Sequence, residues 1–172
     1  MFGQLFPTPE NVDAGSSLHV CQRVMSLQDG KKKMSKSDVS KLACINLIDD
    51  PEMIRSKVKK AKTDSLGTIT YEPDQRPELS NLLRIYSAVE GIDVKKSPQL
   101  FTDDNMFSFK EKLSNKLIDK ICPIGERALK MCATEEDRLL EILDIGARKA
   151  NNRAETTLTR MKEQVGILRR KL

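Results

Sequence analysis

The chain has 172 residues, of which 38% are hydrophobic and 32% charged, with a formal net charge of +5 and a sequence pI of about 9.0. This composition argues against a disordered chain. The length is sufficient for one domain, or for a small domain and part of another. No apolar run approaches the roughly 20 residues that a membrane-spanning helix needs. The basic surplus fits either a polyanionic partner or a solvated basic surface.

The first part of the chain is expected to be mostly loop. Prolines, glycine and serines punctuate residues 1–24, and the stretch from Leu18 to Leu27 has room for one short strand. No basic segment precedes an apolar one, and no arginine appears before Arg23, so we expect neither a signal peptide nor a transit peptide at this start. A loop over Gly30–Ser37 follows, and the β-branched segment Ala43–Ile48 favours a strand or an extended link.

The first predicted helix runs from residue 51 to about Ala61. Asp50 is placed to cap its free N–H groups, and Pro51 suits its first turn. Ile54, Val58 and Ala61 recur at helical spacing and define its apolar face.

Two more helical regions are predicted before residue 132. Ser80 is expected to cap a helix that Gly91 ends, and residues 92–103 are expected to be irregular. Apolar residues from Phe107 to Ile121 predict a long amphipathic helix. Pro123 should interrupt it, with a further helix to about Met131.

The remaining sequence also has helical periodicity. Thr134-Glu-Glu-Asp137 resembles a capping box, and Leu139 to Ala147 and Ala150 to Leu168 follow at helical spacing, with Gly146 as a possible break or close-packing point. The whole pattern predicts one or two extended pieces followed by five or six helices. We therefore expect a mainly α chain, the edge of an α/β domain leading into a helical one.

Lysines and serines are concentrated in the segment from Met25 to Asp38. Lys33 and Lys36 are three residues apart and are flanked by Ser35 and Ser37, a pattern that suits a loop closing over a polyphosphate. Ammonium groups on such a loop can meet the charge that builds on leaving phosphate oxygens, and the serine hydroxyls can bond phosphate oxygens or cap the next turn. A surface loop that matches by chance is the alternative.

Basic residues outnumber acidic ones between Gly30 and Thr63. Those of the predicted helix 51–61 lie largely opposite Ile54 and Val58, so a solvated face is the expected role of Lys57, Lys59 and Lys60. The cysteines have no zinc-type spacing and the chain has one histidine, His19, so free thiols in a reducing compartment are expected; they are Cys21, Cys44, Cys122 and Cys132.

Lys33-Met-Ser-Lys-Ser37 is identical to the KMSKS signature loop of class I aminoacyl-tRNA synthetases. Other segments are similar, in order, to the bacterial and mitochondrial type of tryptophanyl-tRNA synthetase, and their combination after the loop differs from tyrosyl-tRNA synthetase. These segments are Phe2-Gly-x-Leu-Phe-Pro-x-Pro-Glu10, Val24-Met-Ser-Leu-x-Asp29, Leu47-Ile-Asp-Asp-Pro51, Thr63-Asp-Ser65, Gly67, Tyr71-x-Pro73, Ser80-Asn-Leu-Leu-x-Ile-Tyr86 and Ile145-Gly-Ala-x-Lys-Ala150.

The resemblance implies the C-terminal half of an enzyme that activates tryptophan with ATP, with Mg²⁺, and transfers it to tRNA(Trp). It implies that residues 1–30 are the remnant of a Rossmann-type catalytic domain, 31–38 the signature loop, and 39–172 a helical anticodon-binding domain. Packing of the last helix back on the catalytic domain is the alternative for that helix. It implies catalytic roles for Lys33 and Lys36, and ATP binding by Val24, Lys33, Met34, Ser35, Lys36 and Ser37, with Val24 near the adenine and no protein ligand for a metal. A homodimer and a mitochondrial matrix location, or else bacterial cytoplasm, are further implications.

The sequence departs from the family pattern at several places. Residues 11–20 do not match it, Gly30 and Val39 stand where prolines are usual, and Gly30 is expected to loosen the loop. The family's second signature, His-x-Gly-His, cannot be present with one histidine. By itself the chain is therefore expected to be inactive. The alternative function is a non-catalytic tRNA- or RNA-binding module derived from the synthetase.

Overall fold

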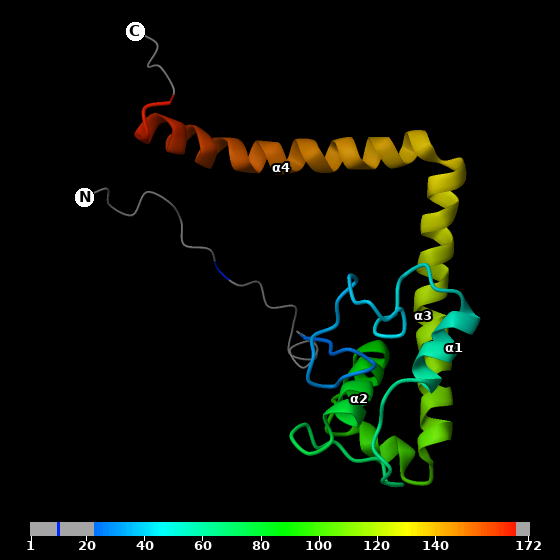
Figure 1. The fold of residues 1–172 in the computed structure, drawn as a ribbon. Coiled ribbons are helices and arrows are strands. Elements are labelled where there is room, and N and C mark those ends of the chain that lie inside the picture. Colours follow the sequence, from blue (N-terminus) through cyan, green and yellow to red (C-terminus); the bar gives the residue numbers. More distant parts are fainter. Residues whose placement is uncertain (1–9, 11–22, 168–172) are drawn as a thin grey trace. The chain divides into compact units, whose positions relative to one another are not determined.

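The computed structural model describes residue 10 and residues 23–167, and everything below refers to these residues. It confirms a mainly helical chain (Figure 1). Four α-helices and one short 3₁₀ helix lie in the described part, where five or six helices were predicted. Their bounds, in chain order, are α1 Pro51–Lys59, α2 Pro77–Glu90, η2 Ser97–Phe101, α3 Met106–Thr134 and α4 Glu136–Gln164.

The start of α1 confirms the sequence prediction. The side chain of Asp50 accepts a hydrogen bond from the Met53 backbone nitrogen at 2.7 Å, and Pro51 occupies the first turn. Ile54 and Val58 are fully buried, as their spacing predicted. The apolar face and the cap together fix this helix in the chain.

The start of α2 corrects the prediction, while its end confirms it. The helix begins at Pro77, three residues before Ser80, and Arg76 precedes it without a side-chain cap. Ser80 is buried inside the helix, where its hydroxyl accepts a hydrogen bond from the Glu72 backbone nitrogen at 3.1 Å. Gly91 ends the helix with φ of 70°, a conformation that glycine adopts at little cost.

The two long helices continue through residues that were expected to stop them. Pro123 lies inside α3, so the predicted interruption is wrong, and the prolyl residue costs one helical hydrogen bond without ending the helix. Gly146 likewise lies inside α4. The capping box is also wrong: Glu135 precedes α4 without a side-chain cap, and the Thr134 hydroxyl donates to the Lys130 carbonyl at 2.9 Å.

No regular strand lies within residues 23–167. Of the expected strand over Leu18–Leu27, residues 18–22 lie outside the described residues, and the rest contributes only an isolated antiparallel bridge between Met25 and Lys33. Ala43–Ile48 is an extended link that ends in a turn rather than a strand. Of its two β-branched residues, Ile45 packs against the buried core and Ile48 is exposed.

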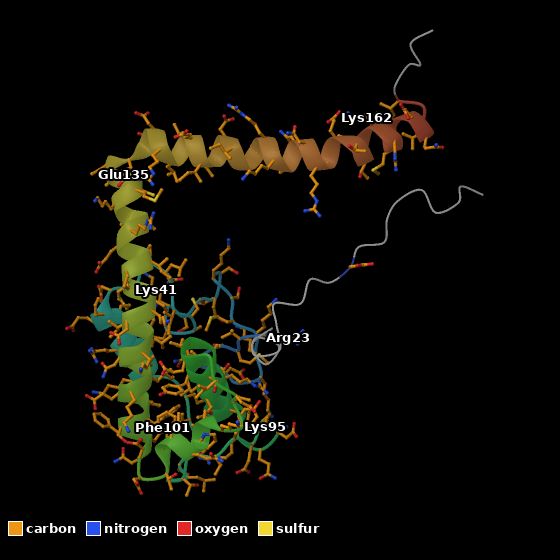
Figure 2. The ribbon with its side chains drawn as sticks, turned by 180° about the vertical axis from the view of Figure 1, so that it is seen from behind. Arg23, Lys41, Lys95, Phe101, Glu135 and Lys162 are labelled. Carbon is orange, nitrogen blue, oxygen red and sulfur yellow. The ribbon has the colours of Figure 1, made fainter. Side chains whose placement is uncertain are left out.

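The buried core joins α1, α2, η2 and α3 to the segment that precedes the signature loop. The rings of Tyr86, Phe101 and Phe109 stack edge to face, with centroids 4.9 and 4.8 Å apart (Phe101 is labelled in Figure 2). Leu27, only 3% exposed, belongs to the same cluster. The chain just ahead of the loop is therefore packed in the helical core.

The described residues from 23 onward divide into two compact units, residues 23–129 and residues 130–167. In the second, none of the described side chains of α4 is buried, and its exposed apolar residues include Leu140, Leu143 and Met161. Among the described residues, no helix combines the length and the apolar character that crossing a membrane requires.

Candidate functional site

The signature loop extends from a short hairpin. The Ser26 backbone nitrogen donates to the Lys32 carbonyl at 2.8 Å, and the Met34 nitrogen donates to the Val24 carbonyl at 3.0 Å. These bonds flank the bridge between Met25 and Lys33. Lys33 therefore has a defined backbone position at the point where the hairpin leads into the loop.

The loop beyond Lys33 is closed by polar contacts of its own. The hydroxyl groups of Ser35 and Ser37 lie 3.0 Å apart, and the Asp38 nitrogen donates to the Ser35 carbonyl at 3.2 Å. The Lys32 ammonium lies 2.7 Å from the Asp38 carboxylate. That hydrogen bond holds the pKa of Asp38 below its usual range, so the pair stays charged and ties the two ends of the signature sequence together.

Lys33 and Lys36 differ from Lys32 in their surroundings. Both are exposed, and neither ammonium forms an ion pair or hydrogen bond with another described residue. Their charges are therefore not neutralised within the described part of the chain. This is the state expected of groups that meet a polyphosphate.

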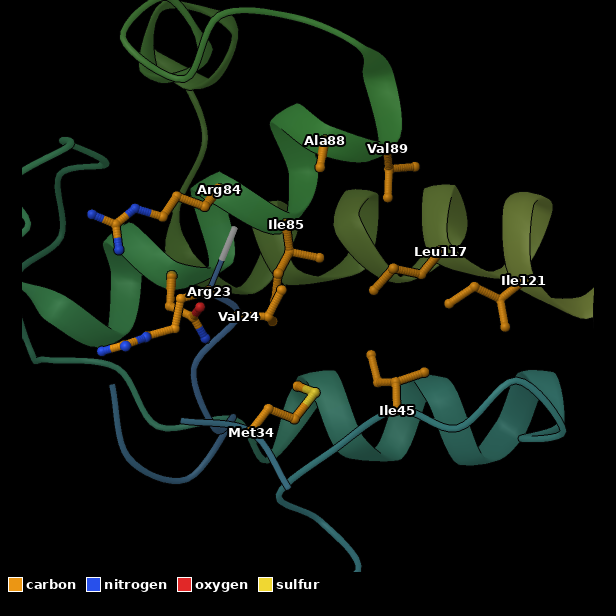
Figure 3. A pocket seen from close by; sticks show the side chains of 11 residues that line it. Arg23, Val24, Met34, Ile45, Arg84, Ile85, Ala88, Val89, Leu117 and Ile121 are labelled. Carbon is orange, nitrogen blue, oxygen red and sulfur yellow. The ribbon is translucent and has the colours of Figure 1, made fainter. Parts of the chain in front are cut away.

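An apolar cavity of about 180 Å³ lies beside the hairpin. Val24 and Met34 line it from the hairpin, and Ile45, Ile85 and Leu117 face the same space from the following link and from α2 and α3 (Figure 3). The structure thus brings together two of the residues predicted to bind ATP. The apolar lining would suit the face of a flat heterocycle, and the placement of adenine near Val24 stays a prediction.

The base of the hairpin is held on α2. The Asn81 side chain accepts a hydrogen bond from the Met25 nitrogen at 3.0 Å and donates to the Met25 carbonyl at 2.9 Å. Gly30 lies against the start of α2, where a Cβ would stand 2.6 Å from the Glu78 nitrogen. The glycine thus allows a close contact with the helix, which argues against the expected loosening of the loop.

Asn81 was not singled out from the sequence as a site residue. The available signal was its position: it lies between Leu79, Leu82 and Leu83 in a stripe that buries against the core, and it is itself 1% exposed. A buried amide needs hydrogen-bond partners, so such a position predicts a polar contact. Its partner, 56 residues earlier in the chain, could not be identified from that signal.

The loop from Lys62 to Pro77 is ordered by one arginine. Arg76 is 4% exposed and pairs with Asp64 through two hydrogen bonds of 2.8 and 2.7 Å. It also donates to the Thr68 carbonyl and to the Thr70 hydroxyl, at 2.8 and 2.6 Å. The Arg76 guanidinium holds the pKa of Asp64 below its usual range.

The basic residues of α1 do not share one environment. Arg55, Lys59 and Lys60 are exposed, as expected. Lys57 is 2% exposed and lies 2.5 Å from the Asp49 carboxylate, so its predicted place on the solvated face is wrong. The ion pair and the packing of its methylene stem explain why a lysine is tolerated there.

A groove of about 450 Å³ runs between α1 and α3. Exposed Arg55 and Lys59 line one side, and Lys110 and the exposed ring of Phe107 line the other. Burial lowers the pKa of Lys110, whose ammonium donates to the Ala61 carbonyl at 2.7 Å. Cations beside an exposed aromatic ring are typical of surfaces that bind single-stranded nucleic acid.

Three of the four cysteines lie among the described residues. Cys44, Cys122 and Cys132 are free thiols, as predicted, and Cys21 lies outside the described residues. Within residues 10 and 23–167, no group of three or more His, Cys, Asp or Glu side chains is placed to hold a metal ion. His19 also lies outside the described residues.

Comparison with known proteins gives a consistent result. A family model described as tRNA synthetases class I (W and Y) matches residues 13–121. The chain is 42% identical over 146 residues to a tryptophan–tRNA ligase of Rickettsia felis, covering 85% of this chain and 44% of that protein. It is 40% identical over 164 residues to a mitochondrial tryptophan–tRNA ligase of Dictyostelium discoideum, covering 95% of this chain and 42% of that protein.

Solved structures are similar as well. The tryptophanyl-tRNA synthetase of Mycoplasma pneumoniae superposes with a TM-score of 0.72 at 27% identity, covering 84% of this chain and 43% of that one. The Campylobacter jejuni tryptophanyl-tRNA synthetase superposes with a TM-score of 0.56 at 21% identity, which shows a shared fold. The chain spans less than half the length of the relatives it matches.

Proposed function

Because this chain belongs to the family of class I tRNA synthetases for tryptophan and tyrosine, we propose that it carries part of a tryptophan–tRNA ligase. That enzyme joins tryptophan to AMP from ATP, releases pyrophosphate, and transfers the tryptophanyl group to tRNA(Trp). The observation that carries the proposal is the pair of exposed lysines, Lys33 and Lys36, on a hairpin whose base is held on α2. The part of the relatives that this chain does not cover would supply the rest of the catalytic site.

The two lysines act on the leaving group. When the tryptophan carboxylate attacks the α-phosphorus, the bond to the bridging oxygen breaks and negative charge moves onto pyrophosphate. Lys33 and Lys36 donate hydrogen bonds to those oxygens and stabilise the charge as it forms. Ser35 and Ser37 are within reach of the same phosphates as hydroxyl donors. Val24 and Met34 contact the adenine from the cavity beside the hairpin.

We propose that Mg²⁺ binds together with ATP. Among the described residues, no group of three or more His, Cys, Asp or Glu side chains is placed to hold it. We assign no residue of this chain to it. When bound, the ion would neutralise part of the triphosphate charge; Lys33 and Lys36 would act on the charge of the leaving pyrophosphate.

The RNA partner is supported by the groove between α1 and α3. Arg55 and Lys59 are exposed, and Arg55, which donates one hydrogen bond to the Asn115 side chain at 2.6 Å, keeps further N–H donors for phosphates; Phe107 offers an exposed ring for stacking. Such contacts make affinity depend strongly on salt. The uncovered apolar residues of α4 support a contact between that helix and another part of the whole protein.

The proposal includes a homodimer and a mitochondrial matrix location, with bacterial cytoplasm as the alternative. Relatives of both origins support a bacterial-type synthetase. Cell fractionation, with an antibody raised to residues 92–103, tests the location and gives the size of the native polypeptide at the same time.

The function is tested with the native protein, by exchange of labelled pyrophosphate into ATP in the presence of tryptophan, with tyrosine as the matched control. Exchange that requires tryptophan supports the proposal. Exchange that requires tyrosine, or none at all from a native product longer than this chain, refutes it. A native product of 19.4 kDa that binds tRNA without exchange would establish the non-catalytic RNA-binding module instead.

A further inference from the structure

Asn81 of α2 makes an unusual contact for a helical side chain. Its amide pairs with both backbone polar groups of one residue, Met25, through hydrogen bonds of 3.0 and 2.9 Å. The two groups of Met25 have opposite polarity, so they fix which atom of the amide is oxygen and which is nitrogen. The contact is partly buried, because Asn81 is 1% exposed and Met25 has intermediate exposure.

The hairpin explains why Met25 needs this partner. Met25 and Lys33 lie opposite each other, and the ladder bonds are made by their neighbours, from Ser26 to Lys32 and from Met34 to Val24. In an antiparallel pair of this kind, the N–H and C=O of the bridged residues point away from the partner strand. The Asn81 amide takes the place that a third strand would occupy.

We propose that Asn81 is a positioning residue for Lys33. Its amide fixes the position and register, on α2, of the hairpin that leads into the signature loop (residues 24–34, the signature hairpin), so that the Lys33 ammonium meets the phosphates of ATP. The inference rests on the proposed function for the role of Lys33. Asparagine suits the task because its short side chain carries a donor and an acceptor on one plane. Aspartate at this place would lack the donor and would turn an oxygen toward the Met25 carbonyl.

The rest of the anchorage is separate from this contact. The Leu27 backbone nitrogen donates to the Ala43 carbonyl at 2.9 Å, and the Leu27 carbonyl accepts from the Lys62 backbone nitrogen at 2.8 Å. The Leu27 side chain is packed in the core. Loss of the Asn81 amide should therefore leave the fold intact and displace the strand that carries Lys33. A displacement of this kind can lower a reaction rate by about 10²-fold.

The test uses the native enzyme with Asn81→Asp, and Asn81→Ser as the second variant if the first does not fold. Ser80→Ala is the matched control, because it removes a buried hydrogen-bond acceptor from the neighbouring position of α2 that serves Glu72 and not the hairpin. We expect kcat for tryptophan-dependent exchange to fall by about 10- to 100-fold in the Asn81 variants, with the KM for tryptophan unchanged. The control should lower the melting temperature and keep kcat.

A double-substitution cycle separates positioning from general stability. If Asn81 acts through Lys33, then Asn81→Asp should cost little further activity once Lys33 is alanine. Equal losses of kcat in the presence and absence of Lys33 would overturn the inference. So would a loss of kcat in Ser80→Ala as large as that in Asn81→Asp at a similar fall in melting temperature. Amide hydrogen exchange at Met25, measured in this chain, should rise in Asn81→Asp, and unchanged protection would also overturn it.

The two proposals fail in different ways. Wild-type enzyme without exchange would refute the tryptophan–tRNA ligase function and, with it, the role assigned to Asn81. Active wild-type enzyme together with fully active Asn81 variants would refute the positioning role alone.

Discussion

Gly125 of α3 lies so close to the carbonyl group of Leu47 that a methyl group on the glycine would overlap the Leu47 oxygen. A glycine inside a helix usually weakens it, but here the missing side chain lets the extended link pack against α3. Gly146 of α4 is also inside a helix, with nothing near the position a Cβ would take.

The first prediction compares the same substitution at these two glycines. Gly125→Ala should destabilise the fold by about 1–3 kcal/mol, because the backbone of the link must move. Gly146→Ala should instead stabilise its helix by up to about 1 kcal/mol, from helix propensity. Urea unfolding followed by circular dichroism measures both, and stabilisation of similar size in the two variants would contradict the close packing at Gly125.

A second comparison concerns the signature hairpin. A Cβ at Gly30 would stand 2.6 Å from the Glu78 nitrogen and 2.7 Å from the Pro77 carbonyl carbon. Gly30→Ala should therefore cost about 1–3 kcal/mol. Gly67→Ala is the control, since nothing lies within 4 Å of that position. Thermal unfolding of both variants gives the answer, and equal melting temperatures would argue that the hairpin shifts freely on α2.

The third prediction addresses the proposed chemistry. In the native enzyme, Lys36→Ala should lower tryptophan-dependent pyrophosphate exchange by about 10²–10³-fold, because a charge aimed at the leaving group is lost. The melting temperature should change little, since Lys36 is exposed and forms no ion pair with the described residues. Lys41→Ala, at another exposed lysine beyond the signature sequence, is the control. Unchanged exchange in Lys36→Ala would remove the assigned role.

The fourth prediction is a pH dependence. Folding lowers the pKa of Asp64 beside Arg76, so the pair stabilises the fold above the usual carboxyl pKa, and this contribution is lost as pH falls through the lowered value. Asp64→Asn should cost about 1.5–3 kcal/mol at neutral pH and progressively less in acid. Melting curves of both proteins across that range test this. A difference that stays constant or grows in acid would exclude the ion pair as its source.

The fifth prediction concerns RNA. Affinity for tRNA should fall as salt rises, and Arg55→Gln or Lys59→Gln should each reduce the slope of that dependence by about one phosphate contact. Lys95→Gln, at an exposed lysine that lines neither cavity, should lower affinity less and keep the slope. Filter binding over a series of salt concentrations provides the data. Salt-independent affinity in the wild type would refute a phosphate-binding groove.

Short sequence signals correctly predicted those helix ends that depend on interactions between neighbouring residues. The cap at Asp50, the turn proline at Pro51 and the helix end at Gly91 each depend on a few neighbouring residues, and each is confirmed. Pro123 and Gly146 were expected to interrupt helices or, for Gly146, to pack closely, and both lie inside continuous helices. A long helix continues through such a residue when the helical turns on both sides of it offset the lost hydrogen bond of a proline or the added backbone freedom of a glycine.

Contacts between distant segments could not be predicted from the pattern. The signature loop was identified from its own residues, but its attachment to α2 depends on Asn81, which lies 56 residues from Met25. Lys57 was expected in solvent from its place on the helix, and its ion pair with Asp49 depends on where the residues before α1 lie. Helical periodicity fixes which face is apolar, and it carries no information about which loop covers that face.

Leu27 ties inactivation by heat to the unfolding of the helices. Its side chain is part of the cluster that also holds Ile54, Leu83 and Phe109, so we expect melting of these helices to release the hairpin as well. A substitution deep in that cluster, such as Leu83→Ala, should therefore behave as a temperature-sensitive allele. Under the proposed function, the defect at the restrictive temperature would be a loss of adenylate formation, although Leu83 is a core residue of α2 and not part of the signature loop.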